Sequence, residues 1–333
     1  MPKSFIESTI VREDLPFEVP LRPQSLDEFL GQDVIRDRLE VLIGAAKQRS
    51  EPLCHCLFSG PPGLGKTTLA NILARAMGTN LVVTSGPVIE KAGDLAGILT
   101  SLKAGDVLFI DEIHRLNRSM EEYLYQAMED FALDLMIDNG PNARSVQVKL
   151  NPFTLAGATT RLGLLSEPLR TRFGFTCRLE YYDVSTLERI LQRTALILHM
   201  KMDQESAMEI ARRSRGTPRV ANHLLRWVRD FAQMRNNNVI NRSIVSQALQ
   251  MLSIDEKGLD EMDIKMLQIM IDHHEGGPVG INAIAASVGE EPTTIEEVYE
   301  PYLILQGFLK RTPRGREVTS LGYQHIRRNG RGG

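Results

Sequence analysis

Cysteine is scarce in this sequence. Only three of the 333 residues are cysteine, namely Cys54, Cys56 and Cys177. Three cysteines cannot form a disulfide framework, and Cys54-His55-Cys56 lacks the paired spacing of a zinc site. We therefore expect all three to be small buried hydrophobic residues of a protein in a reducing compartment.

Long apolar runs are absent as well. No stretch approaches the roughly 18 consecutive apolar residues of a membrane-spanning helix. The first residues carry Glu7, Arg12, Glu13 and Asp14 around no long apolar centre, so they do not resemble a secretory signal. These two absences predict a cytoplasmic protein with no membrane partner.

An overall excess of positive charge is also missing. The 39 Lys and Arg residues face 42 acidic residues, which leaves a formal net charge of -3 and excludes a global basic field. The charge is distributed unevenly, however. From Leu309 to the end there are seven basic residues and one acid, so this stretch carries +6 and the rest of the chain -9. A contact with a polyanion is therefore expected at the C-terminal end.

The length suggests two or three domains, since domains usually contain about 100 to 200 residues. Up to about residue 180, short apolar runs alternate with helical patterns, as in a parallel sheet covered by helices. We predict strands over 54–59, 81–85, 106–110 and 153–157, helices over 66–77 and 119–129, and a hairpin over 133–150 around Asn139-Gly140-Pro141.

The remainder of the chain has a different pattern. Residues 185–252 are helical throughout, with a break at Gly216-Thr217-Pro218. Helices predicted over 260–273, 281–288 and 293–305 precede two short strands over 308–319, which is the order of a winged helix. The predicted domains are therefore 1–182, a large α/β domain; 183–254, a small all-α domain; and 255–333, a winged-helix head.

A phosphate-binding loop follows the first predicted strand. Gly60-Pro61-Pro62-Gly63-Leu64-Gly65-Lys66-Thr67 matches the pattern G-x-x-x-x-G-K-[ST]. The glycines let backbone N–H groups surround the phosphates, and the next helix points its positive end at them. Lys66 can reach the β- and γ-phosphates, and the Thr67 hydroxyl can bind Mg²⁺.

Two carboxylates end a later apolar strand, at Asp111 and Glu112. Alone, they would fit a solvated acidic turn equally well. With the phosphate loop upstream, Asp111 is placed to hold Mg²⁺ through its water shell, and Glu112 to polarise the water that attacks ATP.

These motifs, in this order, resemble the AAA+ ATPases and, more closely, the RuvB family, the motors of bacterial Holliday-junction branch migration. The resemblance covers essentially the whole chain. It rests on the following segments: Arg22-Pro23, Gly31-Gln32, Gly60–Thr68, Ser85-Gly86-Pro87, Glu90–Leu95, Asp111–Leu116, Gly157–Arg161, Gly216–Arg219, Gly307–Leu309 and Arg311–Arg316.

The resemblance implies a role for each matching residue. Leu21, Arg22 and Tyr182 would line the adenine pocket, and Gly63, Lys66, Thr67 and Thr68 would hold phosphates and metal. Thr159 would be the polar sensor that orients the water, with Thr160 as the competing choice. Arg172 would be the arginine finger, and Arg219 the second sensor. Glu129, Asp130 and Phe131 would lie near the nucleotide of a neighbouring subunit.

The expected DNA contact lies on the wing, which is the pair of short strands predicted over 308–319. The third helix of the head carries Glu296, Glu297 and Glu300 and no basic residue from Thr293 to Gln306, so it is a poor reader of bases. Positive charge instead lies at Lys310, Arg311, Arg314 and Arg316, which favours phosphate contact without sequence readout. We take Arg311 and Arg316 as the DNA-binding residues. RuvB relatives often carry another basic residue before the third helix, where this chain has Glu290-Glu291-Pro292.

The hairpin is the expected partner site. Leu133, Leu135 and Ile137 alternate along its first strand; such residues are core by default, but an exposed apolar face would suit a protein partner. In the RuvB family the matching hairpin binds RuvA.

The sequence therefore predicts an ATP- and Mg²⁺-dependent, ring-forming DNA translocase. By resemblance it would be a homohexamer that moves Holliday junctions with RuvA, in a larger complex with RuvC. The alternative is a clamp-loader-type ATPase, although a basic wing is not the usual third domain there. A protein-remodelling AAA+ enzyme would require an aromatic pore loop, and Ser85–Ala92 contains no aromatic residue.

Overall fold

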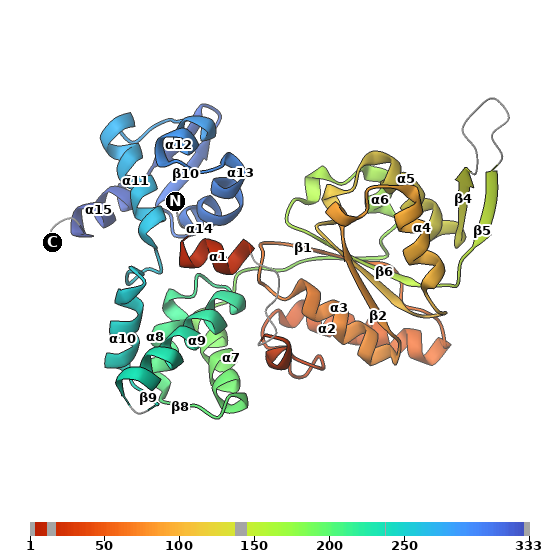
Figure 1. Cartoon of the computed structure of the whole chain (residues 1–333), viewed down its shortest axis with the longest axis horizontal. Coiled ribbons are helices and arrows are strands. Elements are labelled where there is room, and N and C mark those ends of the chain that lie inside the picture. The colour runs from red at the N-terminus through yellow and green to blue at the C-terminus, as the bar shows by residue number, and fades with distance from the viewer. Residues whose placement is uncertain (1–3, 12–17, 137–144, 237, 330–333) are drawn as a thin grey trace. The chain divides into compact units, whose positions relative to one another are not determined.

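The computed structural model describes residues 4–11, 18–136, 145–236 and 238–329 and divides into two compact units (Figure 1). One unit is Pro20–Tyr181; the other combines Met1–Val19 with Tyr182–Gly333. The sequence placed residues 1–182 together. In the structure the N-terminal helix α1 (Phe5–Val11) instead packs on a lid helix, α9 (Pro218–Arg235), so the ATPase unit begins only at Pro20.

A five-stranded sheet forms the centre of the ATPase unit, in the order β2-β3-β6-β1-β7 with all neighbours parallel. Its strands are β1 (Cys56–Ser59), β2 (Leu81–Ser85), β3 (Val107–Asp111), β6 (Thr154–Thr159) and β7 (Phe175–Arg178). Four of them lie where the sequence predicted strands. The edge strand β7 was not predicted, because its four residues alternate between buried and exposed and form no apolar run.

Helices cover both faces of this sheet, α2 and α3 on one side and α4, α5 and α6 on the other (Figure 1). They span α2 (Asp33–Arg49), α3 (Lys66–Met77), α4 (Ala92–Ser101), α5 (Arg118–Asp130) and α6 (Glu167–Thr171), with 3-10 turns at Val19–Leu21, Gly86–Val88, Ile113–Arg115 and Leu162–Leu164. Because both faces are covered, β1, β3 and β6 are buried over almost their whole length.

The predicted hairpin forms from β4 (Ala132–Met136) and β5 (Ser145–Lys149), which pair antiparallel. The partner-site hypothesis required Leu133 to lie on an exposed face, and it does not. It is 1% exposed and belongs to the core beneath α5, since the base of the hairpin packs on the ATPase unit. Val146 on the opposite strand is 45% exposed. Ile137 and the side chain of Leu135 lie outside the described residues.

The lid consists of α7 (Val184–Ile197), α8 (Gln204–Arg213), α9 and α10 (Arg242–Met251). A very short parallel pair, β8 (Lys201–Met202) with β9 (Val239–Ile240), ties two of its loops together. Two residues per strand produce no sequence pattern, so the lid was predicted as purely helical.

The head is a winged helix, as predicted. It contains α11 (Glu261–His274), α12 (Ile281–Val288), α13 (Pro292–Thr294), a π-helical segment (Ile295–Tyr299), α14 (Glu300–Leu305), the strands β10 (Leu309–Thr312) and β11 (Gly315–Val318), and α15 (Ser320–Asn329). The helix predicted over 293–305 is thus interrupted by a π segment. The final helix α15 was missed, because its basic residues resembled a tail.

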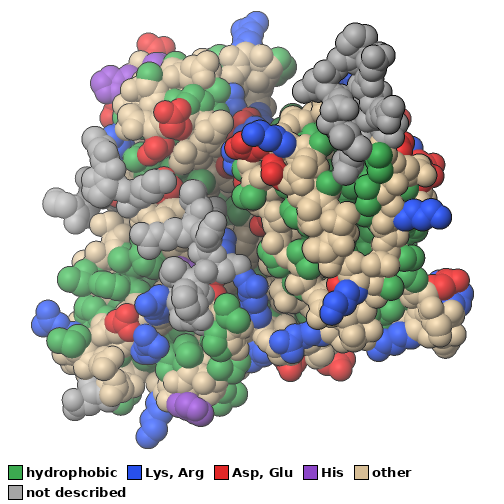
Figure 2. All heavy atoms as spheres, turned by 45° about the vertical axis from the view of Figure 1, so that its right-hand side comes forward, with side chains coloured by type: hydrophobic (Ala, Val, Ile, Leu, Met, Phe, Trp, Pro, Cys, Tyr) green, Lys and Arg blue, Asp and Glu red, His purple; other side chains and the backbone are tan. Residues whose placement is uncertain are grey.

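The expectations of no membrane-spanning helix and no global basic field can be checked on the described residues. Among them, no helix is both long and apolar enough to cross a membrane. Figure 2 shows basic, acidic and apolar side chains interspersed over the visible face.

Cys56 and Cys177 are buried as expected, but Cys54 is exposed, so the prediction that all three cysteines are buried was wrong for one of them. Burial raises the pKa of Cys177 to about 12, whereas the neighbouring Cys56 side chain lowers the pKa of Cys54 to about 7.

The burial of Leu133 yields a stability prediction. Leu133→Ala should lower the free energy of unfolding by about 2–5 kcal/mol, because it leaves a cavity in the core. Val146→Ala, across the same hairpin, should change it by less than about 0.5 kcal/mol. Urea unfolding of both variants measures this, and equal losses would show that Leu133 is not part of the core.

Candidate nucleotide site and DNA-contact surface

The sheet order brings the predicted catalytic motifs to one edge. β1 leads into the phosphate loop, β3 ends at Asp111 and β6 ends at Thr159, and these strands are neighbours in the order β3-β6-β1. Because all are parallel, their carboxyl ends meet at the same edge, where ligands bind in open α/β sheets. The backbone N–H of Gly60 donates to the Thr159 carbonyl at 3.1 Å, which fixes the loop to the end of β6.

The phosphate loop depends on glycine where the backbone is left-handed or crowded. Gly60 has a φ of +132°, and a Cβ there would lie 2.5 Å from the Leu179 carbonyl oxygen. Gly63 and Gly65 have φ values of 76° and 105°. The loop then enters α3 at Lys66, so the N-terminal end of this helix adjoins the loop.

The Lys66 ammonium lies inside this loop. Its Nζ donates to the carbonyls of Gly60 at 2.9 Å and Pro61 at 2.8 Å, and the residue is 8% exposed. Thr67 beside it is half-buried, and Thr68 is buried. A nucleotide phosphate can replace the carbonyl oxygens as the acceptor, so the charge is in place before the ligand arrives.

Asp111 and Glu112 face different partners. Asp111 accepts the Glu112 N–H at 2.9 Å, whereas Glu112 accepts from Arg115 Nη1 at 3.0 Å. Glu112 is left-handed, with a φ of 47°, and its carbonyl oxygen would lie 2.5 Å from a Cβ at position 86, so Gly86 has to be glycine. The candidate base is thus held by a salt bridge on a solvent-accessible side, with 42% of its side chain exposed.

Thr67 and Asp111 suit Mg²⁺ in the way nucleotide sites usually hold it. Hydroxyl and carboxylate oxygens are hard ligands, and Mg²⁺ typically takes one or two of them together with phosphate and water. In the part of the chain that the structure describes, no cluster of three or more His, Cys, Asp or Glu side chains forms a closed metal site. The hydroxyl of Thr67 and the carboxylate of Asp111 therefore fit a Mg²⁺ ion bound together with a nucleotide.

The two sensor candidates, Thr159 and Thr160, differ in how far they are buried. Thr159 is 1% exposed, and its hydroxyl contacts His114 Nδ1 at 3.1 Å and accepts the Arg161 N–H at 3.0 Å. Thr160 is half-buried. The Thr159 hydroxyl thus has two partners within the chain, and both threonines remain candidates for the sensor.

The arginine-finger candidate is bound by its own neighbours. Arg172 donates through Nε and Nη2 to Glu129 Oε2 at 3.0 and 2.7 Å and through Nη1 to the Pro168 carbonyl. Its guanidinium carbon lies 4.5 Å from the centre of the Tyr125 ring. Glu129 is therefore a partner of Arg172, whereas Asp130 is exposed and Phe131 packs edge-on against Phe153.

The adenine-pocket and second-sensor candidates are divided between the two units. Leu21 is buried and Arg22 half-buried in the ATPase unit. In the other unit, the N–H of Tyr182 donates to the Gly216 carbonyl at 2.8 Å, and Arg219 Nη2 lies 3.8 Å from Glu18 Oε2. Glu18 also contacts His223 Nε2 at 2.5 Å, a partner that no sequence signal indicated.

On the wing, the two predicted DNA-binding arginines share one buried carboxylate. Arg311 Nε donates to Glu300 at 2.6 Å and Arg316 Nε at 3.0 Å, while the Glu300 side chain is fully buried. Burial by itself would raise the pKa of Glu300, but the hydrogen bonds from Arg311 and Arg316 lower it overall. Arg311 remains 52% exposed and Arg316 only 17%, so Arg311 is the more available to phosphate.

Comparisons with known proteins agree with this geometry. Three family models cover the chain: the Holliday junction DNA helicase RuvB P-loop domain over residues 21–179, the RuvB AAA lid domain over 182–255, and the RuvB C-terminal winged helix domain over 256–327. The chain belongs to the RuvB family. It is 80% identical to the RuvB subunit of the Holliday junction branch migration complex of Protochlamydia amoebophila, over 98% of both chains.

Other RuvB relatives support the same assignment. Identity to RuvB of Chlamydia pneumoniae is 57%, over 96% of this chain and 95% of that one. The Thermotoga maritima RuvB Holliday junction branch migration motor is 52% identical, with a TM-score of 0.85 over 92% of this chain and 98% of that chain. The predicted fold of AAA+ P-loop domain, lid and winged helix is confirmed, and the chain is an AAA+ ATPase with a nucleotide-binding P-loop.

The sequence did not reveal the residues that pair with the candidate functional residues. Arg115, His114 and Glu18 each pair with a candidate residue, and Glu300 joins both wing arginines. Arg115 could have been found, since it lies three positions after Glu112 in a 3-10 turn. The others are brought to their partners only by tertiary folding.

Hydrolysis in this RuvB-family chain should depend on Glu112 far more than nucleotide binding does. Glu112→Gln should retain ATP affinity and lose turnover by about two or more orders of magnitude, because it removes a positioned general base. Steady-state ATPase rates beside nucleotide titrations test this. Arg115→Ala serves as the control, since it frees the carboxylate without removing it. An ATPase rate near wild type in Glu112→Gln would show that another group is the base.

Arg172 should act on the ATP of a neighbouring subunit. Arginine fingers supplied in trans accelerate hydrolysis by roughly 10³ or more. Mixing Arg172→Ala with Lys66→Ala should therefore restore turnover at interfaces that combine an intact finger with an intact phosphate loop. The absence of rescue in mixtures shown to co-assemble would contradict action in trans.

Proposed function

We propose that this chain is an ATP-driven DNA translocase that moves Holliday junctions. The observation that carries the proposal is the presence, on one chain, of a phosphate loop aligned with Asp111 and Glu112 and of a winged helix with paired arginines. The name of its 80% identical relative, a subunit of the Holliday junction branch migration complex, supports it.

ATP binding would begin with an exchange of partners. The first turn of α3 and Lys66 bind the phosphates in place of the Gly60 and Pro61 carbonyls. Thr67 and Asp111 would hold Mg²⁺, which neutralises phosphate charge when bound. Glu112 then leaves Arg115 and accepts a proton from the attacking water, while Thr160 or Thr159 orients that water.

We propose a hexameric ring in which Arg172 of one subunit serves the ATP of the next. A finger that serves a neighbour must leave Glu129, which is 60% exposed and therefore accessible at an interface. The RuvA contact is proposed for the outer part of the hairpin, where Val146 is exposed, and RuvC would join the larger complex.

A clamp-loader-type ATPase is the second candidate and is less favoured. Such an enzyme acts as an assembly switch and has no use for a basic wing on every subunit. The paired Arg311 and Arg316 are explained by translocation along DNA of any sequence.

The deciding experiment measures movement of a synthetic four-way junction. The chain with RuvA and ATP should convert the junction into two duplexes, while Lys66→Ala should not. ATP hydrolysis is measured with no DNA, with linear duplex and with the junction. Hydrolysis that the junction stimulates without strand exchange would favour the loader.

DNA binding should show phosphate contact without sequence preference. Arg311→Ala should weaken binding equally on two unrelated duplexes and reduce the slope of log affinity against log salt by roughly 0.9. Arg316→Ala should have a smaller effect on the slope, because only 17% of the Arg316 side chain is exposed, against 52% of Arg311. Titrations at several salt concentrations measure both. A loss of about 1 to 3 kcal/mol confined to one duplex would instead indicate base readout.

A further inference from the structure

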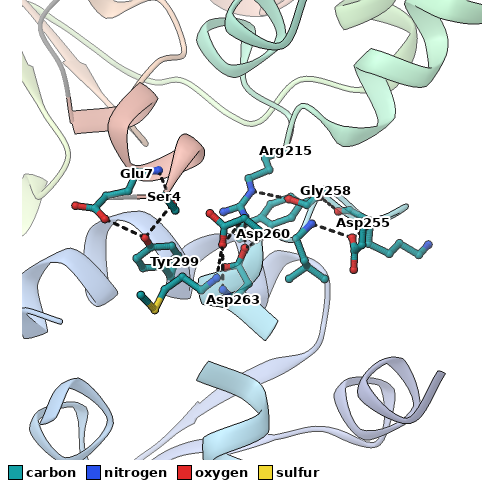
Figure 3. A network of polar contacts seen from close by, with 12 residues as sticks. Ser4, Glu7, Arg215, Asp255, Gly258, Asp260, Asp263 and Tyr299 are labelled. Atoms are coloured by element: carbon teal, nitrogen blue, oxygen red, sulfur yellow. Dashed lines mark hydrogen bonds and ion pairs between the residues drawn. The ribbon is translucent and has the colours of Figure 1, made fainter. Parts of the chain in front are cut away.

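A lid arginine is enclosed by residues of the head. Arg215 lies between α8 and α9 and is 2% exposed. Its Nε donates to the Gly258 carbonyl at 2.8 Å, and its Nη2 donates to Asp263 on α11 (Figure 3). Its guanidinium carbon lies 4.9 Å from the centre of the Tyr302 ring on α14. One side chain of the lid thus reaches the head linker, the first head helix and the third.

Charge holds this contact in place. Asp260, whose Oδ1 lies 3.9 Å from Arg215 Nη2, forms the capping box of α11 together with Asp263. Burial raises the pKa of Asp263 well above its usual value; Arg215 opposes that rise and Asp260 adds to it. Two buried carboxylates thus share one guanidinium, and removing Arg215 would leave both buried without a counter-charge.

Further bonds cross the same joint. Arg213 Nη1 donates to the Ile254 carbonyl at 3.2 Å, and the Tyr302 hydroxyl donates to the Lys257 carbonyl at 2.6 Å. His325 on α15 contacts Asp255 in the linker at 2.6 Å. The linker between lid and head is therefore fixed from both sides.

The N-terminal helix α1 adds contacts with both the lid and the head. Glu7 is 2% exposed and accepts from the Tyr299 hydroxyl at 3.2 Å, and Ser4 Oγ lies 3.2 Å from the same hydroxyl (Figure 3). Tyr299 ends the π segment of the head, while the other contact of α1 is with lid helix α9. Helix α1 therefore bridges lid and head.

Arg215 also lies directly beside the candidate nucleotide residues of the lid. It precedes Arg219 by four positions, and its carbonyl accepts from the Thr217 hydroxyl at 3.1 Å. Gly216, the next residue, accepts the N–H of Tyr182. Arg215 thus lies in the loop directly before α9, and the first turn of that helix carries the second-sensor candidate Arg219.

We propose that Arg215 is a positioning residue that locks lid and head into one rigid lever, so that movement of the lid on ATP turnover reaches the wing undiminished. The inference rests on the proposed function for the source of that movement. The lock itself follows from the buried contacts of Arg215.

The rigidity can be measured without ATPase or DNA-binding activity. Spin labels at Met234→Cys on the lid and Gln324→Cys on α15 use two exposed sites, in a Cys54→Ser background that removes the exposed native thiol. Electron spin resonance should give one narrow distance that is unchanged between ADP and a non-hydrolysable ATP analogue. Arg215→Ala should broaden it. A wild-type distance that shifts with nucleotide, or an unbroadened distance in Arg215→Ala, would overturn the proposal.

The functional measurement is the coupling between ATP hydrolysis and branch migration. In Arg215→Ala, the base pairs migrated per ATP hydrolysed should fall about 5- to 100-fold, the usual range of coupling between sites, while basal ATPase and duplex binding persist. Arg212→Ala, at an exposed position of α8 three residues before Arg215, is the matched control and should retain wild-type coupling. Equal coupling in both variants would refute the lever.

A second variant separates the lever from mere stability. Arg215→Met with Asp263→Asn removes the guanidinium and one buried charge but keeps an acceptor for the Asp260 N–H. Its melting temperature should exceed that of Arg215→Ala, whereas its coupling and spin-label distance should stay defective. Recovery of coupling together with stability would show that Arg215 only stabilises the fold. If wild type shows a rigid lever but moves no junction, the proposed function fails and the lock stands.

Discussion

The parallel pairing of β3, β6 and β1 is the constraint on which the rest of the ATPase unit depends. It puts the phosphate loop, Asp111 and Thr159 at one edge of the sheet, although they are far apart in the chain. The helices that make parallel connections possible bury both faces, and burial in turn holds the strands in register. The left-handed turn at Glu112 and the glycine at position 60 are local solutions to crowding at this edge.

A second theme is that the charged groups proposed to act on ligand are already paired. Lys66 is bound to loop carbonyls, Glu112 to Arg115, Arg172 to Glu129, and the wing arginines to Glu300. An unpaired charge in a partly buried site carries a desolvation penalty, so the free protein satisfies each charge internally. The proposed binding of ATP, of a neighbouring subunit or of DNA would therefore exchange one partner for another. Most of these pairs are accessible to solvent, whereas the Arg215 cluster is enclosed, which fits a permanent joint rather than a switch.

Local sequence signals predicted the elements that are long or chemically marked. The bounds of α3, β2 and α12 agree with the predictions, because each lies between glycine or turn residues and has an uninterrupted apolar pattern. The predictions failed where the pattern is short or mixed, as in β7, α15 and the π segment at Ile295–Tyr299. The predictions for Leu133 and Cys54 failed in opposite directions, because neither alternation along a strand nor residue type tells which positions the rest of the fold covers.

The sequence by itself determined the chemistry. A glycine-rich loop with Lys66 and Thr67, a strand ending in two carboxylates and a basic wing follow from residue type and spacing, because each function requires those groups close together in the chain. Only the tertiary structure decided which charges are paired and which are available. Glu300 lies 11 and 16 residues from the arginines that it holds, and Arg215 lies 48 residues from Asp263. Contacts over such separations arise from the packing of whole helices, which no local pattern encodes.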